Sequence, residues 1–222
     1  MIDVAANVAA VRERIARAAE RSRRDPSTIV LVAAAKTKSA AMLDQAIAAG
    51  VTDVGENYVQ EAAAKKEDVR LPARWHLIGH LQRNKAKRAA EVFDVVQSVD
   101  GVEVAEALSR QAEAAKRTIP VLIEVNLGAE ASKTGVGPAA VANLISRLRE
   151  LPHLVVQGLM TIPPPLGAEE SRPHFRRLRE LGAELGLREL SMGMTDDFEV
   201  AIEEGATMVR IGRAIFGARA RR

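Results

Sequence analysis

The sequence predicts a (β/α)8 barrel with an extra N-terminal helix. Eight short apolar runs alternate with helical patterns along 222 residues, close to the ~250 residues usual for this fold. Strands joined through helices need right-handed crossovers, which build a parallel sheet. Since periodicity does not distinguish a closed sheet from an open one, a doubly wound sheet is the alternative. No linker or repeat beyond the βα unit interrupts the pattern, which indicates one domain over residues 1–222.

The individual elements follow from apolar residues placed between turn formers. An amphipathic pattern predicts the first helix over residues 3–22. Runs rich in Val, Ile and Leu predict strands at residues 29–35, 51–55, 75–79, 92–99, 120–126, 154–160, 189–192 and 207–211. Helical spacing of apolar side chains predicts the helices behind these strands at residues 39–49, 61–66, 82–91, 102–116, 138–150, 169–186 and 196–204.

Composition excludes several kinds of protein. The chain has no cysteine, which rules out disulfides, thiolate metal sites and cysteine nucleophiles. No apolar stretch approaches the ~20 residues of a membrane span, and the first residues lack the pattern of a signal peptide. We therefore expect a cytoplasmic protein without membrane contact. The net charge is +3, and one Trp, one Tyr and four Phe leave little for base stacking, so we expect no nucleic-acid partner.

Lys36 is the most informative single residue. It follows the apolar run 29–35, which reads as a buried strand. A lysine delivered from a strand end into a pocket loses its proton readily and becomes an amine nucleophile for carbonyl compounds. The alternative is a solvated loop lysine, since lysine is rarely buried without a partner.

Other polar clusters also fall at predicted strand ends. These are Lys36-Thr37-Lys38-Ser39, Gly55-Glu56-Asn57-Tyr58, Gly79-His80-Leu81-Gln82, Ser191-Met192-Gly193-Met194-Thr195 and Arg210-Ile211-Gly212-Arg213. In a (β/α)8 barrel the active site lies where strands end and βα loops begin. Five clusters on one face therefore indicate a functional site.

The last two clusters follow the seventh and eighth strands, where barrels often hold a phosphate group. Glycine allows close backbone approach to an anion, hydroxyl groups donate, and a helix start presents free N–H groups. Turn formation and helix capping by Thr195 or Asp196 are the alternative for either loop alone.

An anion site opposite a strand-end lysine describes a pocket for pyridoxal 5'-phosphate. Arg210 ends the eighth strand, and a guanidinium beside the pyridine nitrogen would keep that nitrogen unprotonated and weaken the ring as an electron sink. Pairing of Arg210 with Glu124 or Glu56 is the alternative.

The ordered motifs of the chain resemble the YggS/PROSC family of pyridoxal phosphate homeostasis proteins. The resemblance runs from the first strand to the last and rests on residues 32–38, 55–57, 75–85, 158–161, 191–196 and 209–212. It implies a barrel similar to the N-terminal domain of alanine racemase, with pyridoxal 5'-phosphate held on Lys36 as an aldimine. It also implies cofactor contacts from Asn57, Met160, Ser191, Gly193, Thr195, Arg210, Gly212 and Arg213. Thr195 replaces a serine found in many members and retains the hydroxyl.

Two further residues, Lys133 and His80, each have two possible roles. The resemblance extends to the segment 126–135, where Lys133 is either a second amine for cofactor transfer or a solvated loop lysine. His80 either lines the site or fixes its loop. No second His or acid at ligand spacing accompanies it, so we expect no metal.

Three functions fit these residues. The resemblance implies a carrier that holds pyridoxal phosphate for intracellular homeostasis with little or no turnover, supplies recipient apoenzymes, and is a monomer. A racemase-like enzyme is the second, and Tyr58, as the only tyrosine, would be its second acid–base group. The third is a cofactor-free enzyme that acts on a phosphorylated sugar through Lys36.

Overall fold

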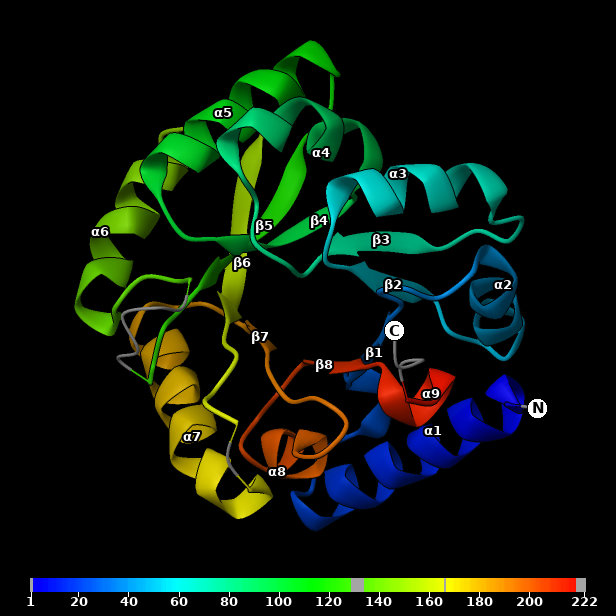
Figure 1. The fold of residues 1–222 in the computed structure, drawn as a ribbon. Helices are drawn as coiled ribbons and strands as arrows, with labels where there is room; N and C mark the ends of the chain where they lie inside the picture. Colours follow the sequence, from blue (N-terminus) through cyan, green and yellow to red (C-terminus); the bar gives the residue numbers. More distant parts are fainter. Residues whose placement is uncertain (1, 129–133, 166, 219–222) are drawn as a thin grey trace.

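The computed structural model describes residues 2–128, 134–165 and 167–218. Eight parallel strands close into a barrel in sequence order, and helices surround it (Figure 1). The strands are β1 Val30–Ala34, β2 Asp53–Glu56, β3 Arg74–Leu77, β4 Val95–Val99, β5 Ile119–Glu124, β6 Leu154–Met160, β7 Glu189–Ser191 and β8 Met208–Ile211. Pairing of β8 with β1 closes the sheet. This confirms the predicted barrel and excludes the open, doubly wound alternative.

The helices lie close to their predicted positions. They are α1 Val4–Arg21, α2 Ala40–Ala48, α3 Val59–Asp68, α4 Ala86–Val92, α5 Val102–Ala114, α6 Pro138–Arg149, α7 Ala168–Glu184, α8 Phe198–Glu203 and α9 Arg213–Phe216. Two short pieces were not predicted, the 3-10 helix Pro26–Thr28 and α9, and the helix predicted over residues 82–91 begins as a 3-10 helix at Arg83–Lys85 before α4. The fourth strand, Val95–Val99, lies within the range 92–99 in which the sequence predicts it, and Val92 ends α4.

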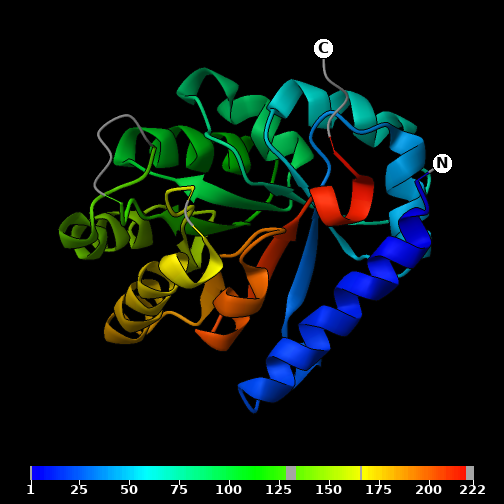
Figure 2. The ribbon, with the colours of Figure 1, turned by 60° about the horizontal axis from the view of Figure 1, so that its bottom comes forward.

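The extra helix α1 covers the outside of the barrel. Its start is capped by Asp3, whose side chain accepts a hydrogen bond from the Ala6 amide at 3.0 Å. Buried Val4, Val8 and Val11 recur at helical spacing and face the barrel. The helix packs against α2, α8 and α9, which Figure 2 shows beside it. It therefore ties the last helix of the barrel to the first.

The apolar core has two parts. The larger part fills the layer between strands and helices. A separate, smaller cluster consists of Val95 on β4, Leu122 on β5 and Met160 on β6. All three side chains of the small cluster are fully buried. The predicted pocket residue Met160 belongs to this cluster.

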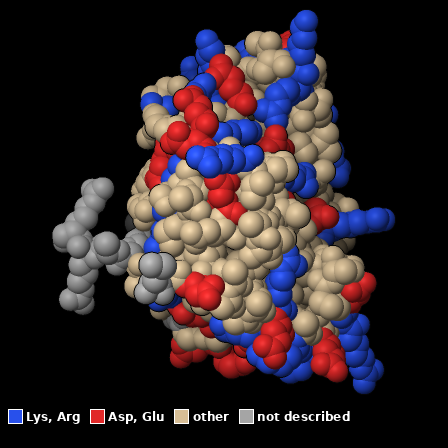
Figure 3. Space-filling model, turned by 90° about the vertical axis from the view of Figure 1, so that its right-hand side faces the viewer, with Lys and Arg blue, Asp and Glu red and all other residues tan. Residues whose placement is uncertain are grey.

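Charged side chains are mixed on the surface. On the face in Figure 3, Lys and Arg are interspersed with Asp and Glu and do not form one continuous basic region. Among the described residues, no helix has the length and apolar character needed to cross a membrane.

We predict that Leu122→Ala lowers the free energy of unfolding by about 2–5 kcal/mol, since it leaves a cavity in a closely packed cluster. Denaturant unfolding measures this change. Val155→Ala is the matched control, because Val155 lies in the neighbouring strand and is 45% exposed; its cost should stay below about 1 kcal/mol. Equal losses for the two variants would contradict a packed interior cluster.

Candidate functional site

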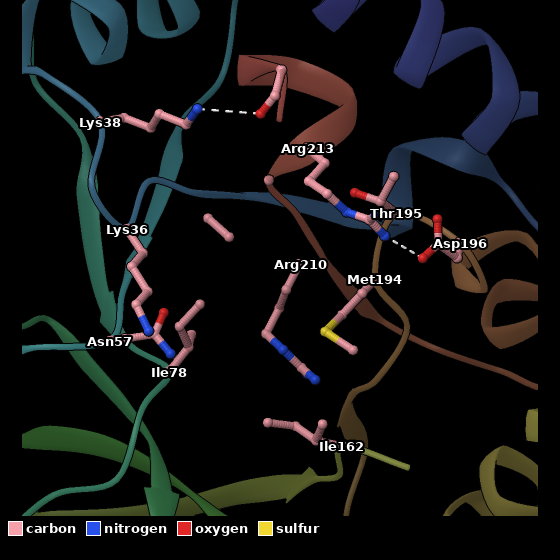
Figure 4. Close-up of a pocket in the computed structure, with 13 residues that line it drawn as sticks. Lys36, Lys38, Asn57, Ile78, Ile162, Met194, Thr195, Asp196, Arg210 and Arg213 are labelled. Atoms are coloured by element: carbon pink, nitrogen blue, oxygen red, sulfur yellow. Dashed lines mark hydrogen bonds and ion pairs between the residues drawn. The ribbon is translucent and has the colours of Figure 1, made fainter. Parts of the chain in front are cut away.

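A cavity of about 230 Å³ opens where the strands end. It is lined by Ala34, Lys36, Lys38, Asn57, Ile78, Ile162, Met194, Thr195, Asp196, Arg210, Gly212, Arg213 and Gly217 (Figure 4). The structure thus brings together six of the nine predicted site residues: Lys36, Asn57, Thr195, Arg210, Gly212 and Arg213. They come from loops far apart in sequence, as expected for one end of a parallel barrel.

Lys36 lies two residues beyond the end of β1 and is half-buried. Its side chain points into the cavity beside Asn57 (Figure 4). The ammonium group donates a hydrogen bond to the Tyr58 hydroxyl at 2.9 Å and lies 4.6 Å from the centre of the Tyr58 ring. Among the described residues, no carboxylate forms an ion pair with Lys36, so the amine is not committed to a salt bridge.

The opposite side of the cavity has the features of an anion site. Thr195 and Gly212 lie there, and α9 begins at Arg213. The Thr195 hydroxyl accepts a hydrogen bond from the Ala214 amide at 3.4 Å. A side chain at Gly212 would approach the Ala34 carbonyl oxygen to 3.0 Å. Glycine therefore lets this loop pack closely against the end of β1.

Two cationic side chains at the rim of the cavity, Arg213 and Lys38, form polar contacts with other protein groups. Arg213 forms an ion pair with Asp196, and both side chains are exposed. The Lys38 ammonium donates to the carbonyl oxygens of Phe216 and Gly217 at 3.0 and 3.2 Å, which fixes the loop after β1 against the end of α9 (Figure 4).

Arg210 forms part of the cavity wall from within the barrel. It is 3% exposed, and its guanidinium donates to the Ser191 hydroxyl at 2.6 Å and to the Thr161 carbonyl at 2.9 Å. Burial lowers the pKa of Arg210 to about 10, opposed by the nearby charges of Asp197 and Glu124. Direct pairing of Arg210 with Glu124 or Glu56, the alternative considered above, is not among the contacts in the described part of the chain.

A chain of buried hydrogen bonds continues from Arg210 through the barrel. The Ser191 hydroxyl donates to Gln97 at 2.6 Å, and the Gln97 amide contacts Nδ1 of His76 at 2.8 Å. Nε2 of His76 lies 2.8 Å from Asp53. Because a carboxylate only accepts, Nε2 carries the proton and Nδ1 accepts from Gln97. Every donor in the chain therefore points from Arg210 toward Asp53.

The Asp53 end of this chain is negatively charged. Although burial opposes ionisation, hydrogen bonds from His76 and Thr52 lower the pKa of Asp53 below its ordinary value. The chain thus connects a cation below the cavity to an anion at the other end of the strands.

Three predicted site residues lie outside the cavity lining. Ser191 is fully buried in the hydrogen-bond chain, where its hydroxyl both donates and accepts, and Met160 lies in the separate apolar cluster. Gly193 has φ of 91°, and its carbonyl accepts from the Arg210 amide at 3.0 Å. A side chain at Gly193 would come within 2.5 Å of the Ala201 side chain. Ser191, Gly193 and Met160 therefore contact groups behind the cavity lining and do not form its surface.

Of the two residues with open interpretations, His80 and Lys133, the structure describes only His80. Nδ1 of His80 lies 3.2 Å from Asp100, which favours a role in fixing the loop. Lys133 lies outside the described residues. Within the described ranges, no group of three or more His, Cys, Asp or Glu residues is suited to hold a metal ion.

Sequence reasoning did not predict that the acidic groups behind the cavity are buried. Glu56 ends β2, is fully buried, and forms an ion pair with Lys65 at 2.5 Å. Burial raises the pKa of Glu56 to about 7. Burial also raises the pKa values of Glu124 and Asp197. His76 and Gln97, polar residues inside otherwise apolar strands, were the available signal for the hydrogen-bond chain.

Taken together, these features define a (β/α)8 barrel with a lysine amine and a loop with glycine and hydroxyl groups around one cavity at one end. The model of the alanine racemase N-terminal domain matches residues 6–220. The chain belongs to this family and, within it, to the pyridoxal phosphate homeostasis proteins, as the sequence motifs predicted.

Individual relatives cover almost the whole chain. It is 48% identical over 224 residues to the pyridoxal phosphate homeostasis protein of Pseudomonas aeruginosa, a match spanning 99% of this chain and 97% of that protein. PipY of Synechococcus elongatus PCC7942, solved with PLP bound, is 38% identical with a TM-score of 0.82 and covers 93% of this chain and 100% of its own. D-threonine aldolase from Filomicrobium marinum, at 19% identity and a TM-score of 0.74, shares the fold over 97% of this chain and 61% of its own.

We predict that Gln97→Met lowers the free energy of unfolding by about 2–4 kcal/mol. The substitution leaves the His76 ring nitrogen without a donor and the proton of the Ser191 hydroxyl without an acceptor, and each such buried group costs about 1–3 kcal/mol. Chemical denaturation measures the change. A loss below about 1 kcal/mol would mean that the buried chain contributes little to stability.

We predict that Glu56 makes stability depend on pH. Its pKa is raised from 4.5 to about 7 in the folded chain, so the folded state binds the extra proton between these values. The stabilising contribution is complete below pH 4.5 and is lost as pH rises through 7.

Glu56→Gln removes this titration. The unfolding free energy of the wild type relative to Glu56→Gln should fall by roughly 3 kcal/mol between pH 5 and pH 8, measured by denaturant unfolding at each pH. Parallel curves for the two proteins would contradict a raised Glu56 pKa.

Proposed function

We propose that the chain binds pyridoxal 5'-phosphate in this cavity, with Lys36 as the point of covalent attachment. The observation that carries the proposal is the joint placement of the Lys36 amine, the backbone at Gly212 and Arg213, and buried Arg210 around one cavity. When bound, the cofactor supplies an aldehyde that condenses with an amine to form a Schiff base. The names of the homeostasis proteins and the PLP bound to PipY support the same ligand.

The residues present fit this cofactor. A phosphate group suits the loop before α9, where the Thr195 hydroxyl, Gly212 and Arg213 line the cavity. The amine of Lys36 projects from the loop after β1. Asn57 and Ile78 line the wall next to Lys36. We assign cofactor contacts to these residues, and a supporting position to Ser191, Gly193 and Met160.

Arg210 determines how the cofactor ring is held. All nitrogens of a guanidinium are donors, so a ring nitrogen that faces Arg210 accepts a hydrogen bond and carries no proton. Even with its lowered pKa of about 10, Arg210 remains charged at neutral pH. An unprotonated ring is a weak electron sink. This favours reversible holding of the cofactor over turnover.

The proposed physiological role is that of a carrier. The chain would hold pyridoxal phosphate in the cytoplasm as a monomer, limit the free aldehyde, and supply apoenzymes. Residues 1–222 would act as one domain. The names of the curated relatives, which refer to homeostasis, support this role.

We predict that borohydride reduction of the protein loaded with pyridoxal phosphate labels Lys36. Peptide mapping of the reduced protein identifies the modified lysine, and Lys36→Ala should lose both the label and the visible absorption. Lys87→Ala is the matched control, because Lys87 is exposed on α4 and does not line the cavity. A wild-type label on a different lysine would overturn the assignment.

One observation favours a second candidate, a racemase-like enzyme. The only tyrosine of the chain, Tyr58, contacts the Lys36 ammonium at the cavity, and a tyrosine is a suitable acid–base group. Incubation with L-alanine and other amino acids separates the two functions. A carrier produces negligible D-isomer over hours, whereas steady racemisation that is lost in Tyr58→Phe would establish the enzyme.

A further inference from the structure

Lys36 lies in a tight turn with an unusual backbone. The Lys38 amide donates to the Ala35 carbonyl at 2.9 Å, so Lys36 and Thr37 are the two central residues of a β-turn. Thr37 has φ of 65°. A turn with positive φ at its third position normally takes glycine or asparagine, and a β-branched residue there is strained. The turn therefore needs support from neighbouring groups.

Helix α3 supplies that support on both sides of Lys36. The Glu61 carboxylate accepts a hydrogen bond from the Thr37 amide at 2.6 Å. The Lys65 ammonium donates to the Ala35 carbonyl at 2.7 Å. Glu61 and Lys65 are themselves paired at 2.8 Å, one helical turn apart. The residues before and after Lys36 are thus held by one ion pair.

A buried carboxylate anchors this pair from the barrel side. Glu56 accepts from Lys65 at 2.5 Å and is fully buried, and Lys65 is 11% exposed. The second oxygen of Glu56 has no hydrogen-bond partner among the described residues. A buried ion pair of this kind adds little stability compared with apolar side chains of similar size. Lys65 of this ion pair also contacts the turn at Ala35, so the pair restrains the backbone next to Lys36.

We propose that Glu61 and Lys65, anchored by Glu56, are positioning residues that hold the turn so that the Lys36 amine faces the cavity. Neither Glu61 nor Lys65 lines the cavity, so both act through the backbone of Ala35 and Thr37. The inference rests on the proposed function in one respect, which is that Lys36 is the amine that takes the cofactor.

The first test compares Glu61→Ala with Glu61→Gln. Glutamine keeps an oxygen that accepts from the Thr37 amide, whereas alanine removes the acceptor. In the ligand-free protein, hydrogen exchange at the Thr37 amide should be about tenfold or more faster in Glu61→Ala and close to wild type in Glu61→Gln. The rate of covalent attachment of pyridoxal phosphate, followed by absorbance, should be slowed in the same order.

The second test separates positioning from stability. Lys65→Met leaves the buried Glu56 carboxyl without its partner and should destabilise the fold, while Glu56→Gln/Lys65→Met removes both ionisable groups and should recover the thermal midpoint. Attachment should remain slow in the double variant, because the donor to the Ala35 carbonyl is still missing. Lys66→Met is the matched control on the same helix, since Lys66 contacts the Val92 carbonyl instead.

The outcomes distinguish the inference from the proposed function. Wild-type attachment rates in Glu61→Ala and in the double variant, with unchanged Thr37 exchange, would overturn the positioning role. Borohydride labelling of another lysine in the wild type would overturn the assignment of Lys36. Thr37 exchange in the ligand-free protein would still report whether α3 holds the turn.

Discussion

A full positive charge buried inside the barrel is the constraint on which the site depends. Arg210 is 3% exposed and has no direct carboxylate partner in the described part of the chain. Removing a guanidinium from water is costly unless its donors are satisfied. Ser191 and the Thr161 carbonyl meet that need, and the chain through Gln97 and His76 extends it to an ionised carboxylate. The strands that carry these residues must keep their register for Arg210 to stay charged and oriented.

This arrangement explains why the interior is more polar than the strand sequences suggest. His76 and Gln97 are both fully buried, and each has one partner on either side along the chain. Because all donors point the same way, reversing one group would place two donors or two acceptors against each other. A cooperative chain of this kind selects one orientation for every member, which makes Arg210 a fixed donor below the cavity.

Sequence predicted the barrel well because apolar periodicity and strand-end chemistry are local signals. All eight strands and the helices α1 to α8 appear near their predicted positions, and six of the nine predicted site residues share one cavity. Ser191 and Met160, which the sequence predicts as cofactor contacts, do not line the cavity. They are paired in register across β6 and β7, and both strands end there, but a sequence does not show which end residues turn inward into the core. The contacts of Glu61 with Thr37 and of Lys65 with Ala35 join residues 24 and 30 positions apart, which leaves no periodic pattern in the sequence.

Lys36 and Arg210, the two cations proposed to contact the cofactor, are held by independent sets of contacts. Arg210 is fixed from inside the barrel by the hydrogen-bond chain, whereas Lys36 sits on a turn held from outside by α3. A positive φ at a β-branched residue costs about 1–3 kcal/mol, and at Thr37 that strain lies next to the amine that the proposed chemistry uses. Strain is retained at functional sites when surrounding contacts over-determine the backbone, and here the contacts are charged groups that add little to stability. Substitutions in α3 should therefore change the orientation of the Lys36 amine and leave the position of Arg210 unchanged.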